Sequence, residues 1–185
     1  DVFLLGQYYN TQFVAYYAIA MKVMSILSLV IVAINVNFAP KIASEYLSNN
    51  KEELQLLARK AARFIAIING VSGILLIIFA PFILNLFGAN YSEALPAFYI
   101  LIAVQILVST FGLVPMYLNM TSKQHLFHKI MLAAVVINLV ANLLLIPTYE
   151  IVGAAISYGI TVLFWNIAVA ICSYKYDKVH LTLWK

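Results

Sequence analysis

Apolar stretches long enough to cross a lipid bilayer recur along the whole sequence. A membrane-spanning helix needs about 17 to 25 such residues to cross roughly 30 Å of hydrocarbon. Five segments meet this length, at residues 13–39, 64–86, 94–118, 130–146 and 151–174. Residues 1–8 are interpreted as the outer end of a sixth helix. This pattern constrains the fold more than any other feature of the chain.

Composition supports the bilayer as the main solvent. The chain is 64% hydrophobic and 10% charged, whereas about a quarter of the residues in an ordinary soluble domain are charged. Backbone polar groups in lipid must be satisfied within a helix or a closed barrel, and the alternation typical of barrel strands is absent. The sequence therefore predicts an all-α, polytopic transmembrane helical bundle with five full spans and the end of a sixth.

The basic residues alternate with the predicted spans. Three connections on one side, at 9–12, 87–93 and 147–150, contain no Lys or Arg. The positive-inside rule therefore places the other connections and the C-terminus in the cytoplasm. This topology explains the formal charge of +4 better than nucleic-acid binding does. The same-side basic residues are Lys41, Lys51, Arg59, Lys60, Arg63, Lys123, Lys129, Lys175, Lys178 and Lys185.

The long basic connection at about 49–63 has the pattern of an amphipathic helix. Asn50 is followed three residues later by Glu53, which is typical of an N-cap and its partner. We expect this connector to lie along the membrane interface before turning into the span at 64–86. It is interpreted as a solvated basic connector, with a contact to anionic membrane lipid as the alternative.

Prolines mark the ends and bends of the predicted spans. Pro40 is expected to close the first full span. Pro115, near Gly112, lies inside an apolar run and predicts a kink, because proline removes a backbone hydrogen bond. Such a kink could serve as a hinge in a transporter, although proline is also common in membrane helices without that role.

Lys22 is the one basic residue deep within a predicted span. A charge at that depth costs several kcal/mol unless it faces water, a partner or a ligand. Asp1 lies at a similar distance from the turn near Thr11, so the two side chains can approach as an ion pair if their helix faces meet. Such a pair could simply pin two helices. The functional alternatives are a site for an anionic substrate group, or a carboxylate that exchanges protons or cations during transport.

Asn138 and Asn142 share a helix face at i, i+4 spacing. Hydrogen bonding between helices is the default interpretation of these amides, with sugar recognition as the bolder one. His125 and His128 lack a nearby third ligand, so no metal site is expected. Neither a phosphate-binding loop nor a nucleophile elbow is present. We therefore predict that the chain is not an enzyme and needs no cofactor.

Several segments resemble a known transporter family in order along the chain. Residues 1–6 (DVFLLG), 14–20 (VAYYAIA) and 39–43 (APKIA) are similar to the start of the second half of polysaccharide flippases. These belong to the MOP (multidrug, oligosaccharidyl-lipid and polysaccharide) exporter superfamily. Further similar segments are 80–94, 138–142, 145–147 and 153–155. Two departures are Ala15 and Glu150, where the family tends to have glycine.

The resemblance implies a MATE-like transporter made of two six-helix bundles around a central cavity that opens to either side in turn. Residues 1–185 would supply most of the second, C-terminal bundle. The first residue is Asp1 rather than Met, and we interpret the start as a cut inside a longer protein that includes an N-terminal bundle.

The implied substrate is a lipid-linked oligosaccharide, flipped across a bacterial cytoplasmic membrane. Its pyrophosphate would suit Lys22, and its hydroxyl groups would suit amides. The rival functions are a multidrug or cation antiporter of the same superfamily and a membrane scaffold that transports nothing.

Overall fold

The computed structural model describes residues 1–182, apart from the side chains of Ala89 and Pro115, and is 88% helical. No strand occurs in this range. The all-α prediction is therefore confirmed. In chain order the elements are α1 (Val2–Tyr8), α2 (Thr11–Leu47), α3 (Lys51–Asn85), the short 3₁₀ helix η1 (Ala89–Ala94), α4 (Leu95–Ser109), α5 (Val114–Met120) and α6 (Gln124–Asp177).

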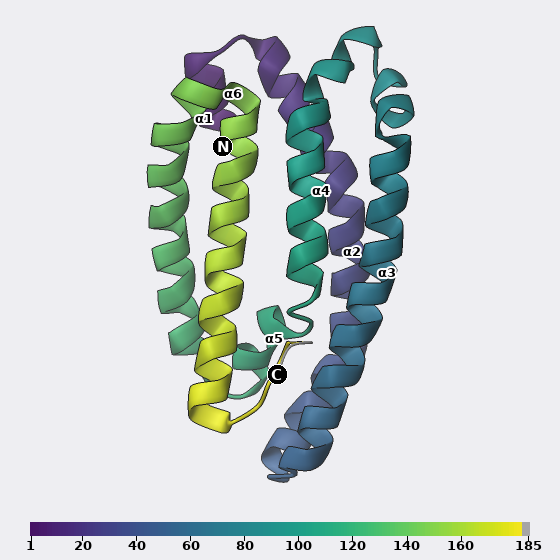
Figure 1. Cartoon of the computed structure of the whole chain (residues 1–185). Coiled ribbons are helices and arrows are strands. Elements are labelled where there is room, and N and C mark those ends of the chain that lie inside the picture. The colour runs from purple at the N-terminus through teal and green to yellow at the C-terminus, as the bar shows by residue number, and fades with distance from the viewer. Residues whose placement is uncertain (183–185) are drawn as a thin grey trace.

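The long helices stand side by side as a bundle, with the short helices at its two ends (Figure 1). Within residues 1–182, four helices are long and apolar enough to cross a membrane. The longest, α6, is folded into two antiparallel arms (Figure 1), which contain the predicted spans 130–146 and 151–174. The helical membrane bundle is thus established, while the number of crossings stays a prediction.

The fold in α6 occurs at Glu150. Its backbone is non-helical, with φ 54° and ψ −130°, a conformation that glycine adopts far more readily than glutamate. Three residues on, a Cβ atom added at Gly153 would collide with the carbonyl of Leu145. Glycine at 153 therefore allows the two arms to begin in close contact.

Helices α2 and α3 are longer than the predicted spans. They contain 37 and 35 residues, or about 56 and 53 Å at 1.5 Å per residue. The expectation that Pro40 closes a span is wrong, because α2 continues through it to Leu47. The expected turn after the connector 49–63 is also absent, because α3 is continuous. The predicted N-cap is confirmed, since the Asn50 side chain accepts a hydrogen bond of 3.3 Å from the Glu53 backbone N–H.

The predicted span 94–118 is broken. Helix α4 ends at Ser109 and α5 begins at Val114, with Gly112 at a positive φ of 63° between them. Pro115 lies in the first turn of α5, where its missing N–H leaves no hydrogen bond unmade. The predicted kink is therefore a complete interruption of the helix.

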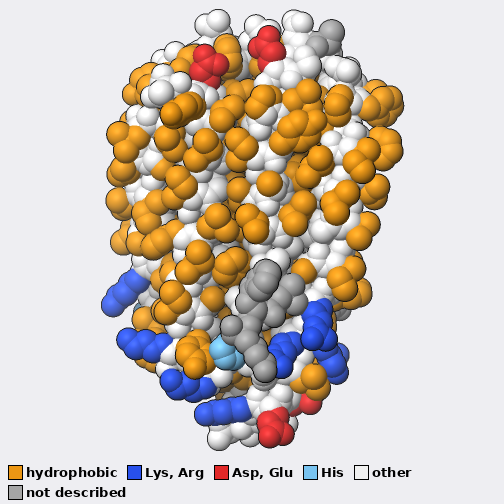
Figure 2. Space-filling view, viewed as in Figure 1, with side chains coloured by type: hydrophobic (Ala, Val, Ile, Leu, Met, Phe, Trp, Pro, Cys, Tyr) orange, Lys and Arg blue, Asp and Glu red, His pale blue; other side chains and the backbone are white. Residues whose placement is uncertain are grey.

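Two buried apolar clusters form the core, one toward each end of the bundle. Tyr17 and Phe98 are among the largest side chains of the first, and Ile42 and Tyr117 of the second. The outer surface of the long helices is also apolar, while Lys and Arg gather near one end of the face in view (Figure 2). An apolar flank with basic residues at one end is the surface expected of a protein dissolved in a bilayer.

Candidate functional site

Three of the four residues predicted to bind substrate or ions, Asp1, Asn138 and Asn142, lie together in a polar network in the half of the bundle that contains α1. Asp1 stands at the start of α1, and its carboxylate accepts hydrogen bonds from two side chains. The Tyr17 hydroxyl of α2 donates to Oδ2 at 3.1 Å, and the Asn142 amide of α6 donates to Oδ1. The carboxylate thus connects three helices.

The network continues along and across α6. Asn142 also donates to Asn138 Oδ1 at 2.9 Å, as their i, i+4 spacing predicted. Asn138 in turn donates to the hydroxyl of Thr161 at 3.0 Å. Thr161 lies on the second arm of α6, so these bonds join the two arms. Interhelical hydrogen bonding of the two amides is therefore confirmed.

One acceptor in the network has no partner. The side-chain carbonyl oxygen of Asn142, whose residue is 1% exposed, receives no hydrogen bond within the described part of the chain. Its neighbour Asp1 forms no ion pair with any described residue. A carboxylate can take up a proton. A carboxylate and a free carbonyl oxygen together also offer the oxygen ligands that hard cations prefer.

Lys22, the fourth predicted residue, lies elsewhere. Its side chain is exposed on the surface of α2, and no hydrogen bond or ion pair engages it among residues 1–182. The ion pair considered between Lys22 and Asp1 does not form, because Asp1 is bound by Tyr17 and Asn142. Ser25, one turn further along α2, is exposed beside Lys22 on the same face.

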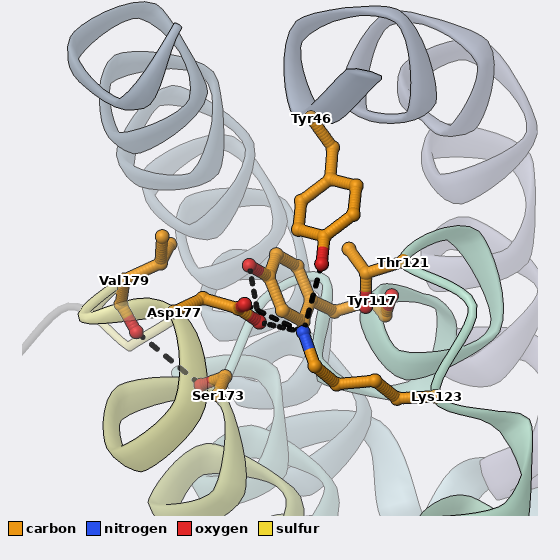
Figure 3. A network of polar contacts seen from close by, with 7 residues as sticks. All are labelled: Tyr46, Tyr117, Thr121, Lys123, Ser173, Asp177 and Val179. Atoms are coloured by element: carbon orange, nitrogen blue, oxygen red, sulfur yellow. Dashed lines mark hydrogen bonds and ion pairs between the residues drawn. The ribbon is translucent and has the colours of Figure 1, made fainter. Parts of the chain in front are cut away.

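A second polar cluster, which the sequence did not predict, lies toward the other end of the bundle. Lys123 Nζ contacts both carboxylate oxygens of Asp177, at 2.5 and 2.7 Å, and donates to the Tyr46 hydroxyl at 3.0 Å. The Tyr117 hydroxyl donates to Asp177 at 3.1 Å. Figure 3 shows these four side chains converging from α2, α5, the start of α6 and its end. A sequence signal existed, because Asp177 is the only acidic residue after Glu150.

The charges in this second cluster satisfy each other. Burial acts to lower the pKa of Lys123, but the hydrogen bonds to Asp177 and Tyr46 and the negative charge of Asp177 outweigh it. The pKa of Lys123 is therefore raised above its ordinary value of 10.5. The cluster holds α2, α5 and the two ends of α6 together, and its two charges are paired with each other.

No group of three or more metal-ligating side chains occurs in the described range.

Tyr17 and Thr161 are the residues of the Asp1 network that sequence reasoning did not assign to it. Tyr17 is completely buried. Only knowledge of which helix faces meet could have placed it beside a carboxylate.

Comparison with known proteins gives one family. No curated protein and no solved structure significantly matches the chain. The sequence model named MatE matches residues 1–147, which is most of the chain and includes Asp1, Tyr17, Lys22, Asn138 and Asn142. With its bundle of apolar helices, the chain belongs to the MatE family of membrane transporters in the MOP superfamily, whose members are not enzymes.

Proposed function

We propose that this chain is the C-terminal bundle of a flippase for lipid-linked oligosaccharide, working by alternating access in a bacterial cytoplasmic membrane. It would act together with an N-terminal bundle of the same protein across a central cavity. The clustering of Lys and Arg near one end supports a cytoplasmic C-terminus.

The observation that carries the proposal is the exposed, unpaired cation on α2. Lys22 lies eleven residues from the start of α2, about 16 Å along the helix, which is close to the middle of a ~30 Å hydrocarbon layer. An ammonium group facing lipid there would cost about 3 kcal/mol or more. We infer that Lys22 faces a water-filled cavity shared with the other bundle, where it meets an anionic group.

A pyrophosphate linkage supplies such a group. It offers several charged oxygens, to which an ammonium donates strong, charge-assisted hydrogen bonds. The face around Lys22 also carries Ala18 and Ser25, both exposed, and their small side chains leave room for a bulky substrate. The sugar portion would then lie further along the cavity.

The experiment replaces Lys22 with alanine in cells that depend on the transporter for surface polysaccharide. We expect export to fall to background while the amount of protein in the membrane stays unchanged. Lys41→Ala is the matched control, since it removes an exposed lysine from the cytoplasmic end of the same helix and should leave export intact. Normal export by the Lys22→Ala variant would contradict the proposal.

One observation favours a cation-coupled antiporter as the second candidate. Asp1 has no cationic partner in the described chain, and the free carbonyl oxygen of Asn142 lies on the residue that binds it. Asp1, Asn138 and Asn142 would then take up and release a proton or cation. The same group could also energise a flippase, so the two candidates differ in the substrate bound at Lys22.

A further inference from the structure

The C-terminal segment, residues 178–182, folds back onto the first turns of α3. The Gln55 side chain binds the backbone of His180 twice, donating to its carbonyl and accepting from its N–H, each at 2.7 Å. Val179 and Leu181 are 2% and 1% exposed. Figure 1 shows the segment leaving α6 and running toward the break between α4 and α5. The segment is therefore held in a defined position.

This docking creates a basic groove of about 390 Å³ between α3 and the C-terminal segment. Lys51 and Arg59 of α3 line it together with Lys178, and Glu52 is the one acidic residue in its lining. No ion pair engages any of these four residues among residues 1–182. The residues that line the groove thus carry a net charge of +2.

Two of the three basic residues of the groove, Arg59 and Lys178, lie at the depth expected of lipid headgroups, whereas Lys51 lies further from the predicted span. Arg59 is five residues before Phe64, where the predicted span begins, or about 8 Å at 1.5 Å per residue. Lys178 is four residues beyond Tyr174, where the last predicted span ends, or about 6 Å. The headgroup layer on each side of the hydrocarbon is roughly 5 to 8 Å thick. Both cations therefore reach the level of the phosphates.

We propose that this groove binds the phosphate-bearing headgroup of an anionic membrane phospholipid. Arg59 supplies a planar group that can donate two hydrogen bonds to a phosphate, while Lys178 and, further from the membrane, Lys51 add positive charge. Lys178 is the C-cap residue of α6, with its Nζ 5.2 Å from the centre of the Tyr174 ring. The site differs from an ordinary basic loop, because the Gln55–His180 hydrogen bonds hold the segment that follows Lys178 against α3. Its ligand affinity should therefore depend on a residue that carries no charge.

The experiment measures lipid binding to the full chain purified in detergent. Short-chain phosphatidylglycerol and phosphatidylcholine are titrated separately, and bound lipid is counted by native mass spectrometry. We expect saturable binding of phosphatidylglycerol and none of phosphatidylcholine. The Lys178→Gln and Arg59→Gln substitutions should each weaken binding about fivefold, the loss expected for one basic residue at an anionic surface.

Gln55→Leu provides the decisive test, because it removes no charge but releases from α3 the segment that follows Lys178 and closes the groove. It should weaken phosphatidylglycerol binding about as much as Lys178→Gln. Lys129→Gln is the matched control. It removes an exposed lysine beside another predicted span, and binding should change less than twofold. Circular dichroism and thermal unfolding confirm that each variant is folded.

Three results would overturn the proposal. One is equal weakening by Lys129→Gln and Lys178→Gln, which would indicate a diffuse charge effect. Another is unchanged binding in a folded Gln55→Leu variant. The third is equally tight binding of inorganic phosphate, measured by its competition with phosphatidylglycerol, which would point to a soluble anion instead of a lipid.

Discussion

The two polar networks of this bundle contain similar types of residue but differ in whether their charges cancel. The cluster around Lys123 and Asp177 contains one cation and one anion in direct contact, with tyrosine hydroxyls on both. The network around Asp1 contains an anion whose partners are neutral, and it has a spare carbonyl at Asn142. A network whose charges cancel suits a structural contact between helices. A network with an unpaired charge suits the reversible binding of an ion.

The largest expected effect is the loss of transport, without a matching loss of stability, when Asp1 is replaced. Asp1→Asn keeps the shape of the side chain but removes its charge, so ion-coupled transport should fall to background. The free energy of unfolding should change by less than about 1 kcal/mol, since single hydrogen bonds between membrane helices average about 0.6 kcal/mol. Transport assays in proteoliposomes and thermal unfolding measure the two quantities. Full transport with a large loss of stability would reverse the assignment.

The opposite result is expected at Asp177. Its removal leaves Lys123 with the Tyr46 hydroxyl but without a carboxylate partner, in a site where the side chains of Asp177 and Lys123 are only 11% and 18% exposed. Breaking a fully buried pair costs about 3 to 5 kcal/mol, and the remaining exposure reduces this to about 2 kcal/mol for Asp177→Ala. The double variant Lys123→Met, Asp177→Leu should recover part of the loss. An unfolding temperature equal to that of the wild type in the Asp177→Ala variant would contradict a structural role for the Lys123–Asp177 pair.

The smallest effect concerns pH. Because the pKa of Lys123 is raised in the folded protein, its charge contributes stability that is fully present below the ordinary value of 10.5. This contribution is lost as the pH rises through the higher folded value. We therefore expect the unfolding temperature of the wild type to fall more steeply above about pH 10.5 than that of Lys123→Met. Parallel curves for the two proteins would contradict a paired Lys123.

Hydropathy and charge patterning predicted the helical membrane bundle, because both follow from transfer of side chains into lipid and need no knowledge of packing. Local rules also placed the cap at Asn50 and the shared face of Asn138 and Asn142. The same rules failed at Pro40, because the backbone groups that a proline frees in a membrane helix can be satisfied by neighbouring helices, side chains or local adjustments of the backbone.

The missed contacts depend on which faces meet. Depth along the helices made Lys22 and Asp1 plausible partners, but rotation about the helix axes decides contact, and it brought Tyr17 to Asp1 instead. Lys123 and Asp177 are 54 residues apart. Their pairing requires both arms of α6 to be in place, which no local pattern encodes.

The clamp between Gln55 and His180 has a consequence for how the protein is made. Its two halves are 125 residues apart, and ribosomes add about 5 to 20 residues per second. The first turns of α3 must therefore wait roughly 6 to 25 seconds for their partner while the rest of the chain enters the membrane. During that interval the Gln55 side chain lacks the backbone partner that it has in the folded protein.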